Sequence, residues 1–78
     1  MPDTARPERE SCARKMALLE DVRTAMNELT AIHDTELAVL LSEDFERLEH
    51  VRVRLKAARE LKASLIDLYR DHVLSHGC

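Results

Sequence analysis

Residues 37–69 read LAVLLSEDFERLEHVRVRLKAARELKASLIDLY, and this stretch decides the fold. Apolar residues recur in it every three or four positions, which is the spacing of one face of an α-helix. The members of this stripe are Leu37, Leu41, Phe45, Leu48, Val51, Leu55, Ala58, Leu61, Leu65 and Leu68. A shorter stripe with the same spacing precedes it, at Leu18, Val22, Ala25, Leu29 and Ile32. The sequence therefore predicts two amphipathic helices.

The chain of 78 residues has no Gly or Pro between Pro7 and Gly77. All-β and α/β folds need such residues in the turns between their elements, so the sequence argues against both classes. The apolar residues are mainly Leu and Ala, which favour helix over strand. We expect an all-α protein with a flexible N-terminal tail over residues 1–7 and a single helical domain over residues 8–78.

The place where the chain reverses has two candidates. At 33–35 either Asp34 or Thr35 could cap the next helix. At 42–44 Ser42 could be the cap, with two acidic residues in the first turn. If both caps were used, a short middle helix would separate two longer ones. We favour the break at 33–35, because the apolar spacing continues in register across 42–44.

A hairpin of two helices has only one internal face. Both apolar stripes are wider than such a face, since further apolar residues flank each of them. The arrangement that covers them is a homodimer. The sequence therefore predicts an antiparallel helical hairpin that dimerises into a four-helix bundle.

Charges are distributed in blocks, although the net charge is only -3. Residues 51–62 are basic, whereas residues 20–36 and 43–49 are acidic and would repel phosphate, which argues against nucleic-acid binding. No apolar run approaches the ~20 residues that cross a membrane. The polar N-terminus lacks the apolar segment of a secretory signal. We therefore expect a cytoplasmic protein with no membrane contact and with reduced cysteines.

The C-terminal residues 72–78 read HVLSHGC and contain a candidate metal site. His72 and His76 are four positions apart on one helical face, a spacing at which two imidazoles can hold one metal ion. Cys78 follows two residues later, and Cys12 would join the group if the chain turned near Ser42. These four residues would form a Cys2His2 zinc site, the one cofactor that the sequence suggests. The alternative is a plain helix end, where histidines favour the helix dipole.

Residues 41–48, LSEDFERL, resemble the signature Ser-Gln-Glu-Leu-Asp of the small aspartyl-phosphate phosphatases of sporulation phosphorelays, which are also helical hairpins. Arg23 and Met26 lie upstream roughly as an Arg-x-x-Met does in that family. The resemblance covers roughly 30 residues. It implies dephosphorylation of a response regulator, with Glu46 in the place of the final acid. The departures from the signature are Glu43 for Gln, Asp44 for Glu, Phe45 for Leu and Glu46 for Asp.

Other enzyme signatures are missing from the sequence. It has no Glu-x-x-His motif of di-iron bundles and no glycine-rich phosphate loop, and a thin bundle offers little concave space for a substrate. We therefore expect a non-enzymatic helical interaction module (an adaptor, chaperone-like or regulatory protein) that presents a helical face to a protein partner. A metal-binding bundle and a phosphorelay phosphatase are the alternatives.

Overall fold

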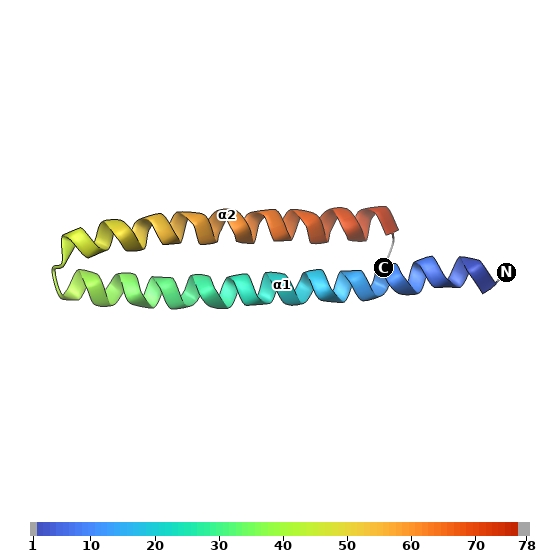
Figure 1. Cartoon of the computed structure of the whole chain (residues 1–78), viewed down its shortest axis with the longest axis horizontal. Coiled ribbons are helices and arrows are strands. Elements are labelled where there is room, and N and C mark those ends of the chain that lie inside the picture. The colour runs from blue at the N-terminus through green and yellow to red at the C-terminus, as the bar shows by residue number, and fades with distance from the viewer. Residues whose placement is uncertain (1, 77–78) are drawn as a thin grey trace.

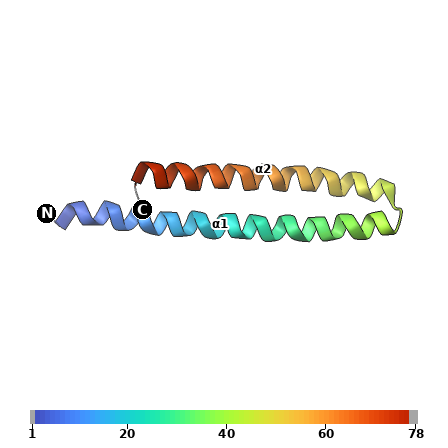
Figure 2. The ribbon, with the colours of Figure 1, turned by 180° about the vertical axis from the view of Figure 1, so that it is seen from behind.

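The computed structural model describes the backbone of residues 2–76 and the side chains of residues 13–76. Two helices, α1 (Pro2–Leu41) and α2 (Phe45–His76), run antiparallel and are joined by residues 42–44 (Figure 1). This confirms the prediction of an all-α helical hairpin. The molecule is a rod of 64 × 14 × 13 Å, in which the N-terminal part of α1 extends past the end of α2 (Figure 2). Among the described residues, neither helix has a segment apolar enough to span a membrane.

The segment that we predicted as a flexible tail is part of α1 in the structure. The helix begins at Pro2, so the backbone of residues 2–7 is helical. The flexibility of this segment stays a prediction.

The buried face of α1 follows one uninterrupted register. Its buried residues recur in steps of four and three and then, after Ile32, in one step of seven; they are Leu18, Val22, Ala25, Leu29, Ile32 and Val39. Glu36 occupies the intervening position, with 25% of its side chain exposed. The break that we favoured at 33–35 is therefore wrong, and so is the short middle helix. A polar residue at a core-facing position interrupted the apolar stripe in the sequence without interrupting the helix.

The hydroxyls near 33–35 explain why this region does not cap a new helix. The Thr35 hydroxyl donates to the Ala31 carbonyl at 3.1 Å, and the Thr30 hydroxyl donates to the Met26 carbonyl at 3.0 Å. Both bonds return to the preceding turn of the same helix. Threonine therefore continues α1 here instead of ending it.

The chain reverses at residues 42–44, where α1 ends in a Schellman motif. The amide of Asp44 donates to the Val39 carbonyl at 3.3 Å, and the amide of Glu43 donates to the Leu40 carbonyl at 3.1 Å. Glu43 has a φ of 58°, the left-handed conformation that this motif requires. Glycine usually occupies this position, so its absence from the sequence concealed the turn.

The cap of α2 is Asp44, and the expectation of Ser42 in that role is wrong. The Asp44 carboxylate accepts the amide of Arg47 at 3.1 Å, which is the usual bond of an N-cap. The Ser42 hydroxyl instead donates to the Val39 carbonyl at 2.9 Å, at the end of α1. Ser42 therefore belongs to the end of α1, whereas Asp44 begins α2.

The face of α2 that meets α1 differs from the predicted stripe. Leu48, Val51 and Leu55 are buried as expected, but Lys62 takes the next core-facing place after Ala58. Leu61 and Leu68 are 50% and 52% exposed. Three further members of the predicted stripe, Leu37, Leu41 and Phe45, are exposed as well. The leucine stripe of this region is thus shared between the hairpin core and the molecular surface.

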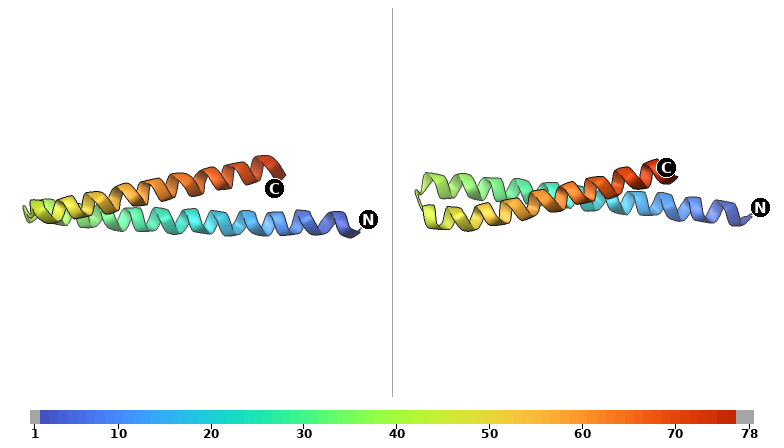
Figure 3. Two further views of the ribbon diagram at one scale, coloured as in Figure 1. Left: turned by 45° about the horizontal axis from the view of Figure 1, so that its top comes forward. Right: turned by 90° about the horizontal axis from the view of Figure 1, so that it is seen from above.

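The buried residues of α2 are confined to the turn half of the hairpin, whereas those of α1 also include Leu18, Val22 and Ala25 in the open half. The core cluster lies in the turn half and consists of Leu29, Ile32, Val39, Leu48, Val51 and Leu55. Towards the C-terminus of α2, the inward positions Leu65 and Tyr69 are only half-buried. The helices cross at a small angle, because their ribbons overlap near the turn in one view of Figure 3 and nearer the open end in the other. A large part of the apolar surface is therefore left uncovered by the hairpin itself.

Candidate interaction surfaces and the C-terminal histidine pair

Large apolar side chains are exposed along one flank of the hairpin, which we call the apolar flank. On α1 its members are separated by 3, 7, 11 and 3 residues, so helical periodicity places them on one side. Phe45 and Ile66 lie on the corresponding side of α2, three heptads apart. The members of the apolar flank are Met16, Leu19, Met26, Leu37, Leu40, Phe45 and Ile66. Exposed apolar residues gathered in this way are typical of an interaction surface.

One end of the apolar flank is hollowed. A groove of about 460 Å³ is lined by Met16, Leu19 and Met26, with Val22 at its base on the core side. Methionine side chains adapt to different partner shapes because they are unbranched and flexible. Glu20, Arg23 and Asn27 also line this groove and give it a polar rim.

A basic belt crosses the middle of the apolar flank. The belt consists of three exposed residues, each at heptad spacing from apolar members of the flank on the same helix: His33, Arg52 and Arg59. His33 Nδ1 lies 3.6 Å from Glu36 Oε1, and an Arg52 guanidinium nitrogen lies 3.6 Å from Glu49 Oε1. Such exposed pairs at i,i+3 contribute little to stability. The belt therefore separates two apolar ends of the flank.

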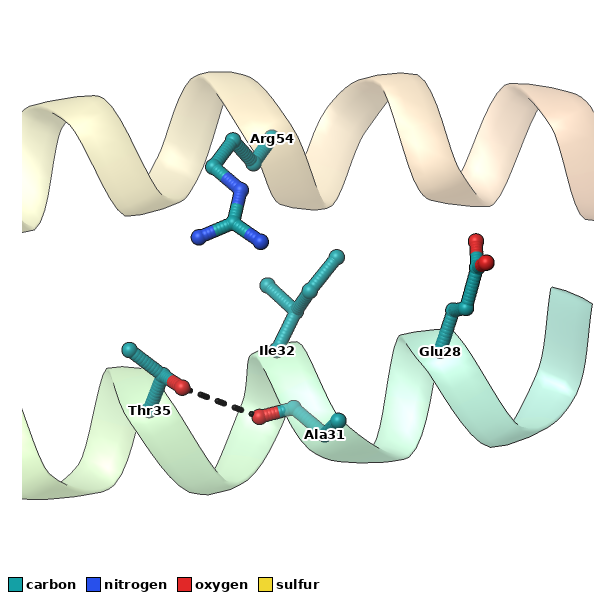
Figure 4. Close-up of a pocket in the computed structure, with 5 residues that line it drawn as sticks. All are labelled: Glu28, Ala31, Ile32, Thr35 and Arg54. Atoms are coloured by element: carbon teal, nitrogen blue, oxygen red, sulfur yellow. Dashed lines mark hydrogen bonds between the residues drawn. The ribbon is translucent and has the colours of Figure 1, made fainter.

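The opposite flank, which we call the grooved face, carries three shallow grooves in a row. The groove nearest the turn, of about 530 Å³, includes Ser42 and Arg47 in its lining. The middle groove, of about 350 Å³, lies between Thr35 and Arg54 (Figure 4). The third, of about 200 Å³, is lined by Glu28 and Leu61 among others. The grooves exist because α1 presents small side chains here, at Thr24, Ala31 and Ala38.

Charges on the grooved face differ between its two halves. The turn half carries Arg47 and Arg54 on α2 together with Asp34 on α1, whereas the open half carries Asp21 and Glu28 on α1. Figure 4 shows Glu28 and Arg54 on either side of Ile32, each pointing towards the other helix. The ion pairs of the described side chains do not join any of these five residues to one another. Sequence reasoning missed this face, although the seven-residue spacing within each charge pair was a usable signal.

The C-terminal histidines lie together as predicted. The ring centroids of His72 and His76 are 4.6 Å apart, with the rings tilted by 44°. The turn at 42–44 also meets the condition that we set for Cys12, because it brings the N-terminal third of α1 alongside the end of α2. The Cys12 side chain and Cys78 lie outside the described residues. Within the part that the structure describes, His, Cys, Asp and Glu form no cluster of three that could hold a metal ion.

The residues that resemble the phosphatase signature are spread along the rod. Ser42 and Glu46 lie at the turn and in the first turn of α2, whereas Arg23 and Met26 lie near the middle of α1. At 1.5 Å per residue, Met26 is more than about 20 Å from the turn. A single chain does not gather these residues into one site, and the phosphatase hypothesis stays a prediction.

Comparisons with known proteins add no assignment to this geometry: no family model, no curated protein and no solved structure matches the chain.

Proposed function

We propose that this protein is a non-enzymatic helical interaction module, in which two hairpins pair into a four-helix bundle and one helical face binds a protein partner. The observation that supports the proposal is the uncovered apolar surface. Among the side chains of residues 13–76, twelve large apolar ones are exposed, and seven of them form the apolar flank. A monomeric soluble protein seldom leaves such a surface uncovered.

The thinness of the hairpin gives the physical reason for association. Each helix of a two-helix rod has one neighbour, so most of its circumference faces solvent. A chain of this size also buries only about 60% of its unfolded surface and is marginally stable alone. Pairing of two hairpins would give each helix a second neighbour and would bury further leucines.

Sedimentation equilibrium at micromolar concentration tests self-association directly. We expect a mass of twice 9.0 kDa. A monomer across this concentration range would contradict the proposal.

Binding of a protein partner is tested by affinity capture that compares the wild type with a Leu19→Glu, Met26→Glu variant. Both substitutions place a charge in the groove of the apolar flank, so a partner of this flank should be lost from the capture. Glu60→Arg, on the outer side of α2, is the control and should capture the same protein as the wild type. Equal capture by all three proteins would remove the apolar flank from the proposal.

A second candidate function is metal binding at the C-terminal end of α2, favoured by the 4.6 Å separation of the His72 and His76 rings. The two imidazoles would supply two nitrogen donors to a zinc ion, and the predicted ligands Cys12 and Cys78 would complete a tetrahedral site. Zinc titration by calorimetry should show one site in the wild type and a large loss of affinity in His76→Ala. His50→Ala, which removes an exposed histidine elsewhere on α2, is the control. Equal, negligible affinity in all three proteins would end this candidate.

A further inference from the structure

We infer that the second copy in the bundle docks on the grooved face, reversed end to end, so that Glu28 of each copy pairs with Arg54 of the other. This inference rests on the self-association proposed above and names its surface and direction. It also assigns Asp21 to Arg47 of the second copy. The apolar flank is then left free for the protein partner.

The first argument is the order of charges along the grooved face. Arg47 and Arg54 are seven residues apart, as are Asp21 and Glu28, so each pair spans about 10 Å of helix. The grooves order these residues along the rod: Arg47 lines the groove nearest the turn, Arg54 and Glu28 line the middle groove, and Asp21 and Glu28 line the third. From the turn outwards, these four residues are therefore two arginines and then two acids, with Asp34 as a further acid in the groove nearest the turn.

The second argument is symmetry, because a two-fold interface brings a surface against itself. If the axis runs along the rod, each level meets the same level of the second copy, so the acidic half meets the acidic half. If the axis runs across the rod between the levels of Arg54 and Glu28, the acidic half meets the basic half. Like charges placed together across an interface are costly, so the reversed arrangement is favoured.

The third argument is the shape of the grooved face. Leu61 and Leu68 project from α2 in its open half, where they are about half exposed. In the reversed dimer they lie over the turn half of the second copy, where Ala31 and Ala38 leave the two larger grooves. Leucines can therefore enter grooves that small side chains leave open, which provides the apolar centre of the interface.

The apolar flank is less suited to a second copy, because its basic belt lies near its middle. Residues near the middle of a face meet the same residues of the second copy whether the two-fold axis runs along the rod or across it. Arg52 and Arg59 would therefore face the same cations of the second copy in both arrangements. The apolar flank better fits a partner that carries carboxylates between two apolar anchors.

Charge reversal with mixing tests the inference. Glu28→Arg alone and Arg54→Glu alone each place like charges together in the homodimer, and we expect each to weaken dimerisation by at least about tenfold. When the two variants are mixed, both contacts become attractive: the two substituted positions pair with reversed polarity, and the unsubstituted Arg54 and Glu28 pair as in the wild type. We therefore expect a heterodimer within about threefold of wild-type affinity, measured by sedimentation of differently labelled chains. An interaction within one chain could not be rescued by mixing.

Matched controls separate this effect from a general effect of charge. Glu60→Arg and Lys56→Glu make the same changes at exposed positions outside the grooved face and should dimerise like the wild type. Circular dichroism establishes that each variant keeps its helix content. The pair Asp21→Arg and Arg47→Glu repeats the test one heptad away, should either of the first variants fail to fold.

The possible failures are distinguishable. A monomeric wild type would overturn both the proposed self-association and this inference. A dimeric wild type whose single variants dimerise normally, or whose variants are not rescued on mixing, would overturn the inference alone. Loss of the dimer in Leu19→Glu, Met26→Glu together with normal charge variants would move the dimer interface to the apolar flank.

Discussion

At the scale of single residues, Glu43 and Glu36 both occupy positions that another residue type would fit better. Glu43 has a positive φ of 58°. In this conformation the Cβ atom is crowded by the backbone, whereas glycine has no Cβ and adopts it without strain. Glu36 points towards the other helix at a place in the buried stripe where an apolar residue is expected. The monomeric hairpin is therefore less stable than it would be with glycine at position 43 and an apolar residue at position 36.

Replacement of Glu43 by glycine should stabilise the protein. The substitution relieves the left-handed conformation, and we expect the free energy of unfolding to rise by about 1 kcal/mol. Urea denaturation followed by circular dichroism measures it. The same change at Glu60, in the interior of α2, should lower stability by about 1 kcal/mol, since glycine weakens a helix interior. A loss of stability in Glu43→Gly would contradict the turn described above.

Replacement of Glu36 by leucine should complete the buried stripe of α1. We expect a gain of about 1 kcal/mol in unfolding free energy, because an apolar side chain replaces a half-buried carboxylate. Thermal unfolding gives the comparison with Glu20→Leu, an exposed position at which little change is expected. A lower midpoint for Glu36→Leu than for the wild type would show that the carboxylate has a stabilising role.

At the scale of the helices, the location of the turn is decided by two competing caps. Asp44 accepts the Arg47 amide and begins α2, whereas Asp34 lies exposed within α1, two turns before its end. The two residues have the same chemistry, so only the path of the backbone distinguishes them.

Alanine at each of these positions provides a matched test of the turn. Asp44→Ala should reduce the free energy of unfolding by about 1 kcal/mol, since the N-cap bond is lost. Asp34→Ala should change it by less than about 0.5 kcal/mol, because alanine favours the helix interior and no cap is removed. Chemical denaturation measures both. The reverse order of effects would place the chain reversal at 33–35.

The error at 33–35 shows what limits prediction of this fold. The apolar stripes correctly indicated two helices and an antiparallel hairpin, because periodicity depends only on the local backbone. The choice of turn depended on Glu36, which interrupted the first stripe, and on Leu37 and Leu41, which extended the second. All three are ordinary residues of a continuous helix once the second helix is in place. Local spacing could not reveal which leucines would meet α1.

At the scale of the whole molecule, the rod is unevenly packed along its length. The core cluster belongs to the turn half, and the inward residues of α2 beyond Ala58 are only partly buried, although Leu18, Val22 and Ala25 of α1 are buried in the open half. Fewer buried contacts there mean that local opening costs less free energy.

Hydrogen exchange should report this gradient. We expect the slowest amides in the turn half, around Ile32 and Leu55, and faster exchange around Tyr69. Mass spectrometry of peptides or NMR of single amides measures it. Uniform protection from end to end would show that the open half is as stable as the turn half, as it would be if a partner covered it fully.

One candidate site lies within a single helix and could be predicted from the sequence, whereas the other is formed by two helices and could not. The His72–His76 pair was predicted from spacing and is adjacent in the structure, since an i,i+4 relation is a property of a single helix. The grooved face was not predicted, because Glu28 and Arg54 come from different helices and their levels depend on the turn. Neither residue stands out in the sequence by itself.

The sequence by itself determined that this protein is helical, that its chain forms two long amphipathic segments, and that two histidines share one face near the C-terminus. These properties follow from residue spacing and from the lack of Gly and Pro between positions 7 and 77. Only the tertiary structure decided where the chain turns, which leucines are buried and which charges share a face. The physical reason is that the burial of a residue and its position along the rod are relations between two helices, and a nine-residue difference in the position of the turn changes every such relation.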